Sequence, residues 1–146
     1  MTTSSSFDHV VPIRTSEDVL RARQASREVG IALGFDEEDQ TRIATAVSEI
    51  ARNVLQHSGA TGEVRLQDAV GDAGRGIVVV VSDSGSGIAD LDGALQDGGS
   101  SLVLRRGAGL PGSKRLMDEF QVDTAVGKGT TVRMVKWIRP VRGSDS

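Results

Sequence analysis

The chain contains no cysteine, which excludes disulfides, thiolate catalysis and cysteine-ligated zinc. Its two histidines, His9 and His57, do not by themselves make a typical metal site. Aromatic residues make up only 3% of the sequence, with one Trp and no Tyr. The core must therefore be built from Val, Leu, Ile and Ala, and the aromatic platforms that stack single-stranded nucleic acid are missing.

The sequence also lacks a dominant charge and a long apolar segment. The formal net charge is -3, with both signs interspersed, so a basic stripe for nucleic acid is absent. The longest aliphatic run, Ile77–Val81, is far too short to span a bilayer, and residues 1–7 show no signal-peptide pattern. We therefore expect a cytoplasmic protein, with no membrane and no nucleic-acid partner. A length of 146 residues suits one domain, 1–146, with flexible ends at about 1–6 and 141–146.

Hydrophobic periodicity predicts a strand followed by two helices in the first part of the chain. Residues 7–14 form the strand, and Thr15 with Asp18 starts the first helix as an approximate capping pair. Gly34 suits the end of that helix, and Asp36 starts the second, which Ser58-Gly59 stops. The inward-facing positions recur at spacings of three and four; they are Val19, Ala22, Ser26, Val29 and Leu33, then Ile43, Val47, Ile50 and Val54.

The second part alternates between strands and glycine-rich segments. The pattern predicts strands at 63–70, 76–81, 121–126 and 130–138, with a turn at 71–76 and a hairpin through Gly127-Lys128-Gly129. Residues 82–87 form a loop, 90–96 a short helix, 97–107 a mobile lid and 110–120 a third helix. This order predicts an α/β two-layer sandwich, with a mixed, mostly antiparallel sheet and three helices on one face.

Glu49 and Asn53 are the first candidate functional residues. Residues four apart share one helical face, and both flank the buried stripe, where the edge of a cleft would lie. A carboxylate there can accept a proton from a hydroxyl, and an amide oxygen can ligate Mg²⁺. The alternative is an ordinary solvated pair on a surface helix.

Two glycine motifs follow. Asp83 ends the valine-rich strand, where a carboxylate can accept a hydrogen bond from an exocyclic amine, and Gly85 and Gly87 let the backbone approach a flat ring. Gly107 and Gly109, followed by Leu110, precede a helix whose free N–H groups can bind phosphate. The alternatives are a strand-terminating turn and a flexible linker. Neither a Walker A loop nor a Rossmann fingerprint is present.

Taken in order, these motifs and Gly129-Thr130 resemble the boxes of the GHKL ATPase superfamily. Within it, the chain looks most like the anti-sigma regulatory serine/threonine kinases, and among these the RsbT-like switch kinases. Ser48–Asn53, Gly109–Asp118 and Val126–Val132 carry the likeness, which extends over roughly 8–138. The implied fold is the Bergerat ATP-binding sandwich.

The resemblance implies a role for each motif. Glu49 would be the catalytic base, Asn53 the Mg²⁺ ligand and Asp83 the adenine-reading carboxylate. The other implied nucleotide contacts are Gly85, Gly87, Gly107, Gly109, Leu110 and Thr130. Two departures stand out: Arg105 replaces a glycine that often begins the lid box, and Gln56 stands where sensor histidine kinases often carry Lys.

The implied activity is phosphorylation of a protein partner by ATP and Mg²⁺, with ADP as product. The implied substrate is a STAS-domain antagonist protein. Further partners would be a phosphatase, another signalling enzyme or a sigma factor, in a partner switch that regulates stress or sigma-factor signalling. Two alternatives remain: an ATP-binding anti-sigma module that sequesters its partner with little or no kinase activity, and a histidine kinase fragment, which would lack its phosphoacceptor helix. An exposed sheet face would allow a homodimer.

Overall fold

The computed structural model describes residues 8–56, 61–71, 74–83, 109–125 and 129–138. Eight elements follow one another along these residues. They are β1 (Asp8–Ile13), α1 (Ser16–Leu33), α2 (Glu37–Gln56), β2 (Gly62–Gly71), β3 (Gly74–Asp83), α5 (Gly109–Leu116), β4 (Glu119–Ala125) and β5 (Gly129–Trp137).

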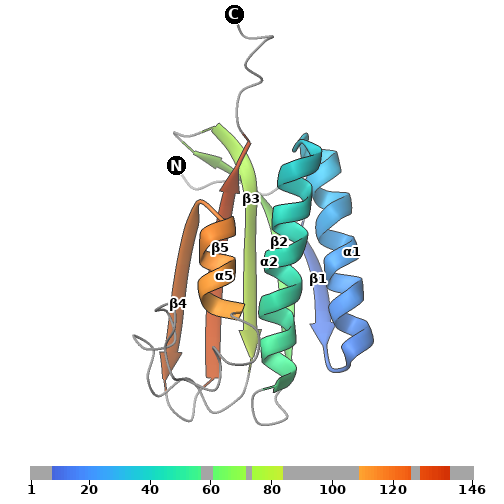
Figure 1. Ribbon diagram of the computed structural model, residues 1–146, viewed down its shortest axis with the longest axis vertical. Coiled ribbons are helices and arrows are strands. Elements are labelled where there is room, and N and C mark those ends of the chain that lie inside the picture. The colour runs from blue at the N-terminus through green and yellow to red at the C-terminus, as the bar shows by residue number, and fades with distance from the viewer. Residues whose placement is uncertain (1–7, 57–60, 72–73, 84–108, 126–128, 139–146) are drawn as a thin grey trace, which may run out of the picture.

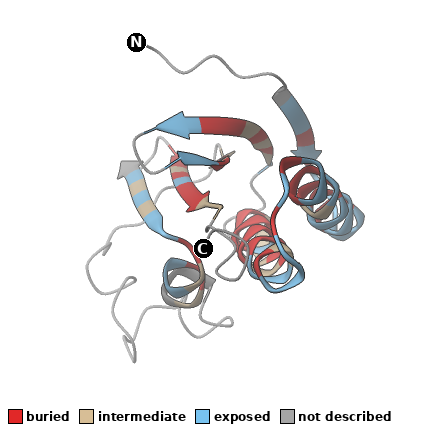
Figure 2. Cartoon of the chain, turned by 90° about the horizontal axis from the view of Figure 1, so that it is seen from above, coloured by how far each residue is buried: buried red, intermediate tan, exposed pale blue. Residues whose placement is uncertain are grey.

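The strands form one sheet in the order β1-β2-β3-β5-β4. Helices α1, α2 and α5 all lie against the same face of it (Figures 1 and 2). The predicted two-layer α/β sandwich is therefore confirmed. Every pairing among the described strands is antiparallel, whereas the sequence led us to expect a mixed sheet. The path through α5 and β4 reverses the chain, so that β5 returns antiparallel to β3.

Side-chain caps fix where the two long helices begin and end. The Asp18 carboxylate accepts hydrogen bonds from the backbone N–H groups of Arg14 (2.9 Å) and Thr15 (3.1 Å) at the start of α1. Gly34 ends α1 with φ 100°, a conformation that favours glycine. The Asp36 carboxylate then accepts a hydrogen bond from the backbone N–H of Asp39 (2.8 Å) and begins α2. The short link makes α1 and α2 an antiparallel pair.

The core lies between this helical pair and the sheet, as the band of buried residues in Figure 2 shows. All nine inward positions predicted on the two helices are buried. They meet the alternate residues of the central strands, namely Val64, Leu66, Ile77, Val79, Val81, Val132 and Met134. None of the described helices combines the length and the apolar character needed to cross a bilayer.

Four predicted boundaries were wrong by two residues or more, and one of them is the start of β4, at Glu119 instead of residue 121. The third helix ends at Leu116 instead of residue 120, because the chain starts to pair with β5: the Asp118 N–H donates to the Val135 carbonyl at 2.9 Å, and its carboxylate accepts from the Trp137 N–H at 2.7 Å. Strand β3 begins at Gly74, so the preceding turn is shorter than expected. It also continues to Asp83. The expected stop at 58–59, the turn at 127–128, the loop at 84–87, the short helix at 90–96 and the lid at 97–107 lie outside the described residues.

Gly76 has no room for a side chain, and Gly76→Ala should destabilise the protein. A Cβ atom there would lie 2.2 Å from the backbone oxygen of Lys136 and 2.9 Å from Trp137 Cε3. We expect a loss of about 1–3 kcal/mol in the free energy of unfolding, measured by urea denaturation. Gly112→Ala in α5 is the control and should raise the free energy of unfolding. A Cβ atom at Gly112 would have no atom within 4 Å, and alanine is more favourable than glycine in a helix by up to about 1 kcal/mol. Equal urea midpoints for Gly76→Ala and wild type would contradict this packing.

Asp18 should make stability depend on pH. Its pKa lies below the ordinary value of 3.8, chiefly because the Arg14 N–H donates to the carboxylate; Arg21 and the Thr15 N–H contribute in the same direction, against burial. The folded pKa lies below the unfolded one, so the stabilisation is present above that unfolded value and is lost as the pH falls through the folded pKa. Asp18→Asn should therefore melt below wild type at neutral pH.

The difference in melting temperature between Asp18→Asn and wild type, measured by circular dichroism, should narrow as the pH falls through the folded pKa of Asp18. Glu28→Gln is the control, because Glu28 is exposed and its carboxylate accepts a hydrogen bond from the neighbouring Gln24 side chain; this variant should melt with wild type throughout. A difference that stays constant between neutral and acidic pH would show that the Asp18 charge is not responsible.

Candidate functional site

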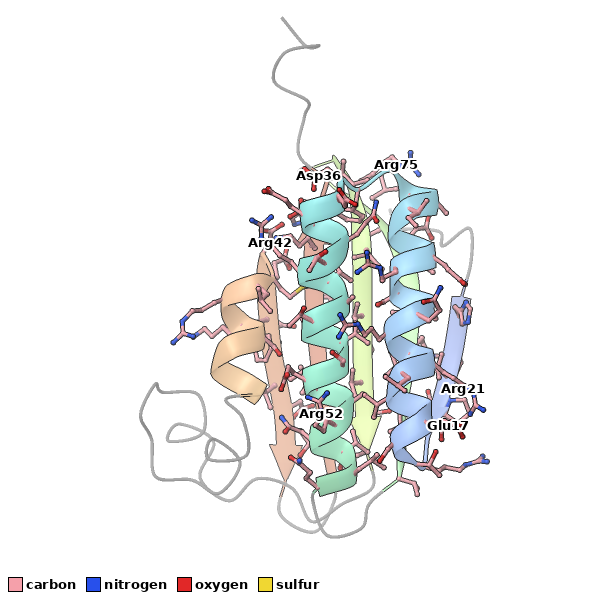
Figure 3. All side chains as sticks on the ribbon, turned by 45° about the vertical axis from the view of Figure 1, so that its right-hand side comes forward. Glu17, Arg21, Asp36, Arg42, Arg52 and Arg75 are labelled. Carbon is pink, nitrogen blue, oxygen red and sulfur yellow. The ribbon has the colours of Figure 1, made fainter. Side chains whose placement is uncertain are left out.

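The last turns of α2 carry Glu49 and Asn53, one turn apart, beside the buried stripe of that helix. The Glu49 side chain is 30% exposed, and its Oε2 atom accepts a hydrogen bond from Arg52 Nη1 at 3.0 Å. Arg52 lies on the lower half of α2 in Figure 3. The ion pair holds the carboxylate at the surface of the helix, where a solvent-exposed group can reach it.

Asn53 is more deeply placed than Glu49. It is only 8% exposed, and in the part of the chain that the structure describes its Nδ2 atom is buried without a hydrogen-bond partner. A buried polar atom left without a partner costs about 1–3 kcal/mol. Such a group is expected at a functional position, because a ligand can supply the contact that the protein does not.

Asp83 and Thr130 meet although 47 residues separate them. They are opposite each other where β3 pairs with β5, and Asp83 Oδ1 accepts a hydrogen bond from the Thr130 backbone N–H at 3.2 Å. Thr130 is 7% exposed and follows Gly129, whose φ of 93° begins β5. The contact fixes the orientation of the Asp83 carboxylate at the end of the sheet.

These two pairs lie at the same end of the sandwich. In Figure 1 the last turn of α2, the arrowhead of β3, the start of β5 and the start of α5 are all at the lower end. Gly109 and Leu110 are the first two residues of α5. Gly85, Gly87 and Gly107 lie outside the described residues.

Helix α5 is fixed against α2 by a buried hydroxyl. Ser113 is fully buried, and its Oγ atom donates to the Ala46 carbonyl at 3.5 Å, one turn before Glu49 on α2. The free N–H groups at the start of α5 therefore belong to a helix whose position relative to the Glu49 and Asn53 pair is set by direct contact.

The residues present fit magnesium and a nucleotide. Magnesium takes hard oxygen ligands and is usually held by one or two protein groups together with phosphate oxygens. Asn53 carries a hard amide oxygen of the kind that Mg²⁺ takes, and its buried Nδ2 donor has no partner among the described residues. The start of a helix, nearby, suits phosphate.

Lys136 was missed by the sequence analysis. It lies on β5 in line with Val132 and Met134, facing the helices, and its side chain is only 4% exposed. The alternation along the predicted strand contained the indication, because a Lys in the third inward position breaks an apolar pattern. Its partners on α2 and α5 could not be identified from the sequence.

Comparison with known proteins identifies the family of the chain. Residues 14–136 match the histidine kinase-like ATPase domain family, so the chain belongs to that family. It is 41% identical over 129 residues to the serine/threonine-protein kinase RsbT of Bacillus subtilis, covering 88% of this chain and 96% of that protein. The resemblance to GHKL proteins of the RsbT type is thereby confirmed.

Anti-sigma F factors are also similar. The chain is 35% identical over 112 residues to that of a Thermoanaerobacter species, with 74% of each protein covered. It is 34% identical over 105 residues to that of Caldanaerobacter subterraneus, covering 69% of this chain and 72% of that protein. The relatives therefore carry two kinds of name, serine/threonine-protein kinase and anti-sigma factor.

Replacing Asn53 by leucine should stabilise the ligand-free protein. The buried amide carries an unsatisfied nitrogen, and an apolar side chain of similar size removes it. We expect a gain of about 1–2 kcal/mol in the free energy of unfolding, measured in urea. Ser48→Ala is the matched control on α2, because the Ser48 hydroxyl is buried but donates to the Ala44 carbonyl at 3.0 Å. Destabilisation by Asn53→Leu would show that the amide is satisfied in solution.

Proposed function

We propose that the chain is an ATP- and Mg²⁺-dependent protein serine/threonine kinase. The observation that carries the proposal is the common location of the Glu49 and Asn53 pair, the Asp83 and Thr130 pair and the start of α5 at one end of the sandwich. Similarity to RsbT over nearly the whole chain supports the reaction class. When bound, ATP supplies the γ-phosphoryl group, and Mg²⁺ offsets the charge on its phosphates.

Glu49 is the proposed catalytic base. Its carboxylate accepts the proton of the partner's serine or threonine hydroxyl as that oxygen becomes the nucleophile. Its 30% exposure leaves it accessible to a protein substrate, and Arg52 holds it in one orientation. Asn53 is the proposed metal ligand, through its amide oxygen.

Asp83 is proposed to read the adenine ring, by accepting a hydrogen bond from its exocyclic amine; the Thr130 N–H, which donates to Asp83 Oδ1, helps to orient the carboxylate. The Thr130 hydroxyl would assist there, and Gly85 and Gly87 would line the same pocket. Gly107, Gly109 and Leu110 would face the phosphates at the start of α5. These assignments extend the family pattern residue by residue.

The proposed substrate is a STAS-domain antagonist protein in a partner-switching system. Phosphorylation adds about two negative charges at the docking surface, which weakens or redirects binding. The released kinase would then engage a second partner, such as a phosphatase, another signalling enzyme or a sigma factor. A protein of this kind acts in the cytoplasm, where ATP and these partners are found.

A second candidate is a sequestering module that binds a sigma factor and transfers little phosphate. The anti-sigma F factors among the relatives favour it. The accessible carboxylate of Glu49 favours catalysis instead. The two functions differ in whether phosphate reaches the purified partner.

Glu49→Gln should abolish phosphotransfer while nucleotide binding persists. The variant keeps the size of the side chain and removes the proton acceptor, so transfer of labelled phosphate from ATP to a purified STAS-domain protein should fall by about 10²–10⁴-fold. Calorimetry with ADP and magnesium should give an affinity close to that of wild type.

Glu28→Gln is the matched control, because this exposed glutamate lies on α1, where its carboxylate accepts a hydrogen bond from the Gln24 side chain. It should transfer phosphate at the wild-type rate. Full transfer by Glu49→Gln would exclude this residue as the base, and partner binding by wild type without any transfer would favour the sequestering module.

A further inference from the structure

A buried ammonium group lies at the end of the sandwich opposite to the candidate site. Lys136 Nζ donates to the backbone carbonyl of Leu116, the last residue of α5, at 3.0 Å. It also lies 3.6 Å from Asp118 Oδ1 and 3.8 Å from Asp39 Oδ1. One side chain of β5 thus contacts the end of α5, the residue that leads into β4, and the first turn of α2.

Stability alone does not account for a charge in this position. Removing an ammonium group from water is costly, and well-packed apolar residues usually replace buried ion pairs without loss of stability. The adjacent inward positions of β5 are Val132 and Met134, so an apolar residue would continue the pattern. What distinguishes Lys136 from them is that its three contacts join separate elements at defined points.

The contact with Leu116 bears directly on the orientation of α5. The last carbonyl groups of a helix lack partners within the helix, and a cation there also interacts favourably with the helix dipole. Helix α5 is a rod of eight residues, roughly 12 Å long. Ser113 holds its middle against α2, and Lys136 holds its end. Two attachment points prevent the rotation that one would allow.

We propose that Lys136 is a positioning residue for phosphate binding. By holding the end of α5, it sets where the first residues of that helix lie relative to Glu49 and Asn53. The inference rests on the proposed function, in which the start of α5 faces the nucleotide phosphates. It assigns to Lys136 no contact with the nucleotide itself.

The surrounding carboxylates allow the ammonium group to be removed. Asp39 Oδ1 accepts a hydrogen bond from Arg42 Nη1 at 2.7 Å, and Asp118 Oδ2 accepts one from the Trp137 N–H at 2.7 Å. Arg42 lies near the upper end of α2 in Figure 3, away from Arg52. Lys136→Met therefore leaves neither carboxylate without a partner, and the substituted protein should fold.

The test compares two ligands on each variant. Adenosine reports the base pocket alone, whereas ADP with magnesium also reports the phosphate contacts. Calorimetry on Lys136→Met should show ADP affinity reduced by at least about tenfold, with adenosine affinity within about twofold of wild type. The ratio of the two affinities does not depend on the fraction of folded protein, so a merely structural role would leave it unchanged.

Two further variants complete the experiment. Arg133 lies on the same strand, and its side chain is 44% exposed. Arg133→Gln should therefore leave the ratio of ADP affinity to adenosine affinity unchanged. Asp118→Asn keeps an oxygen for the Trp137 N–H but removes a negative charge beside Lys136. It should weaken binding of ADP relative to binding of adenosine, as Lys136→Met does. If Lys136→Met does not fold, Asp118→Asn becomes the deciding variant. An unchanged ratio, or an equal fall in both affinities, would overturn the proposal. Wild-type protein that binds neither ligand would overturn the proposed function, and this inference with it.

Discussion

The antiparallel register between β3 and β5 is the constraint on which the candidate site depends. It sets Asp83 opposite Thr130 at one end and brings Ile77 opposite Lys136 near the other. A slip of one residue would turn every side chain of a strand to the other face. Asp83 would then lose its backbone partner, and the Lys136 ammonium group would leave the helices for solvent. The same register therefore fixes the nucleotide end and the buried charge cluster, and the alternating apolar residues of both strands enforce it.

Much of the fold could be predicted because periodicity and capping are local. The helical stripes, the Thr15 and Asp18 start of α1 and the end at Gly34 all follow from neighbouring residues. The end of α5 could not be predicted, because Asp118 pairs with β5 only once that strand is in place. The motifs indicated Glu49, Asn53, Asp83 and Thr130. That Asp83 and Thr130 contact each other depends on the pairing register of β3 and β5, which the motifs do not specify. Lys136 was visible only as a break in a pattern, since its partners come from distant elements.

Two buried polar groups reveal a conflict between stability and chemistry in this fold. Asn53 leaves a nitrogen unsatisfied, and Lys136 buries an ammonium group beside two carboxylates and a backbone carbonyl. Neither is what a sequence selected for stability alone would contain. The rest of the core offsets them with fully buried aliphatic residues such as Ile13, Ile43 and Leu66. RsbT and the anti-sigma F factors are each related to this chain over most of its length and carry different names, so the family relationship by itself does not assign an activity.

The order in which the elements pair along the chain also bears on how the molecule assembles. The α1 and α2 pair, the β2 and β3 pair and the β4 and β5 pair each join neighbours in sequence, whereas the β1 and β2 pair and the β3 and β5 pair must each close a long intervening segment. Local contacts form faster than distant ones, so these two pairings carry the largest cost in loop-closure entropy. The β3 and β5 pairing also creates the Asp83 contact with Thr130. A ligand that contacts both Asp83 and Thr130 would stabilise the paired state of β3 and β5, and would therefore oppose the separation of the two strands.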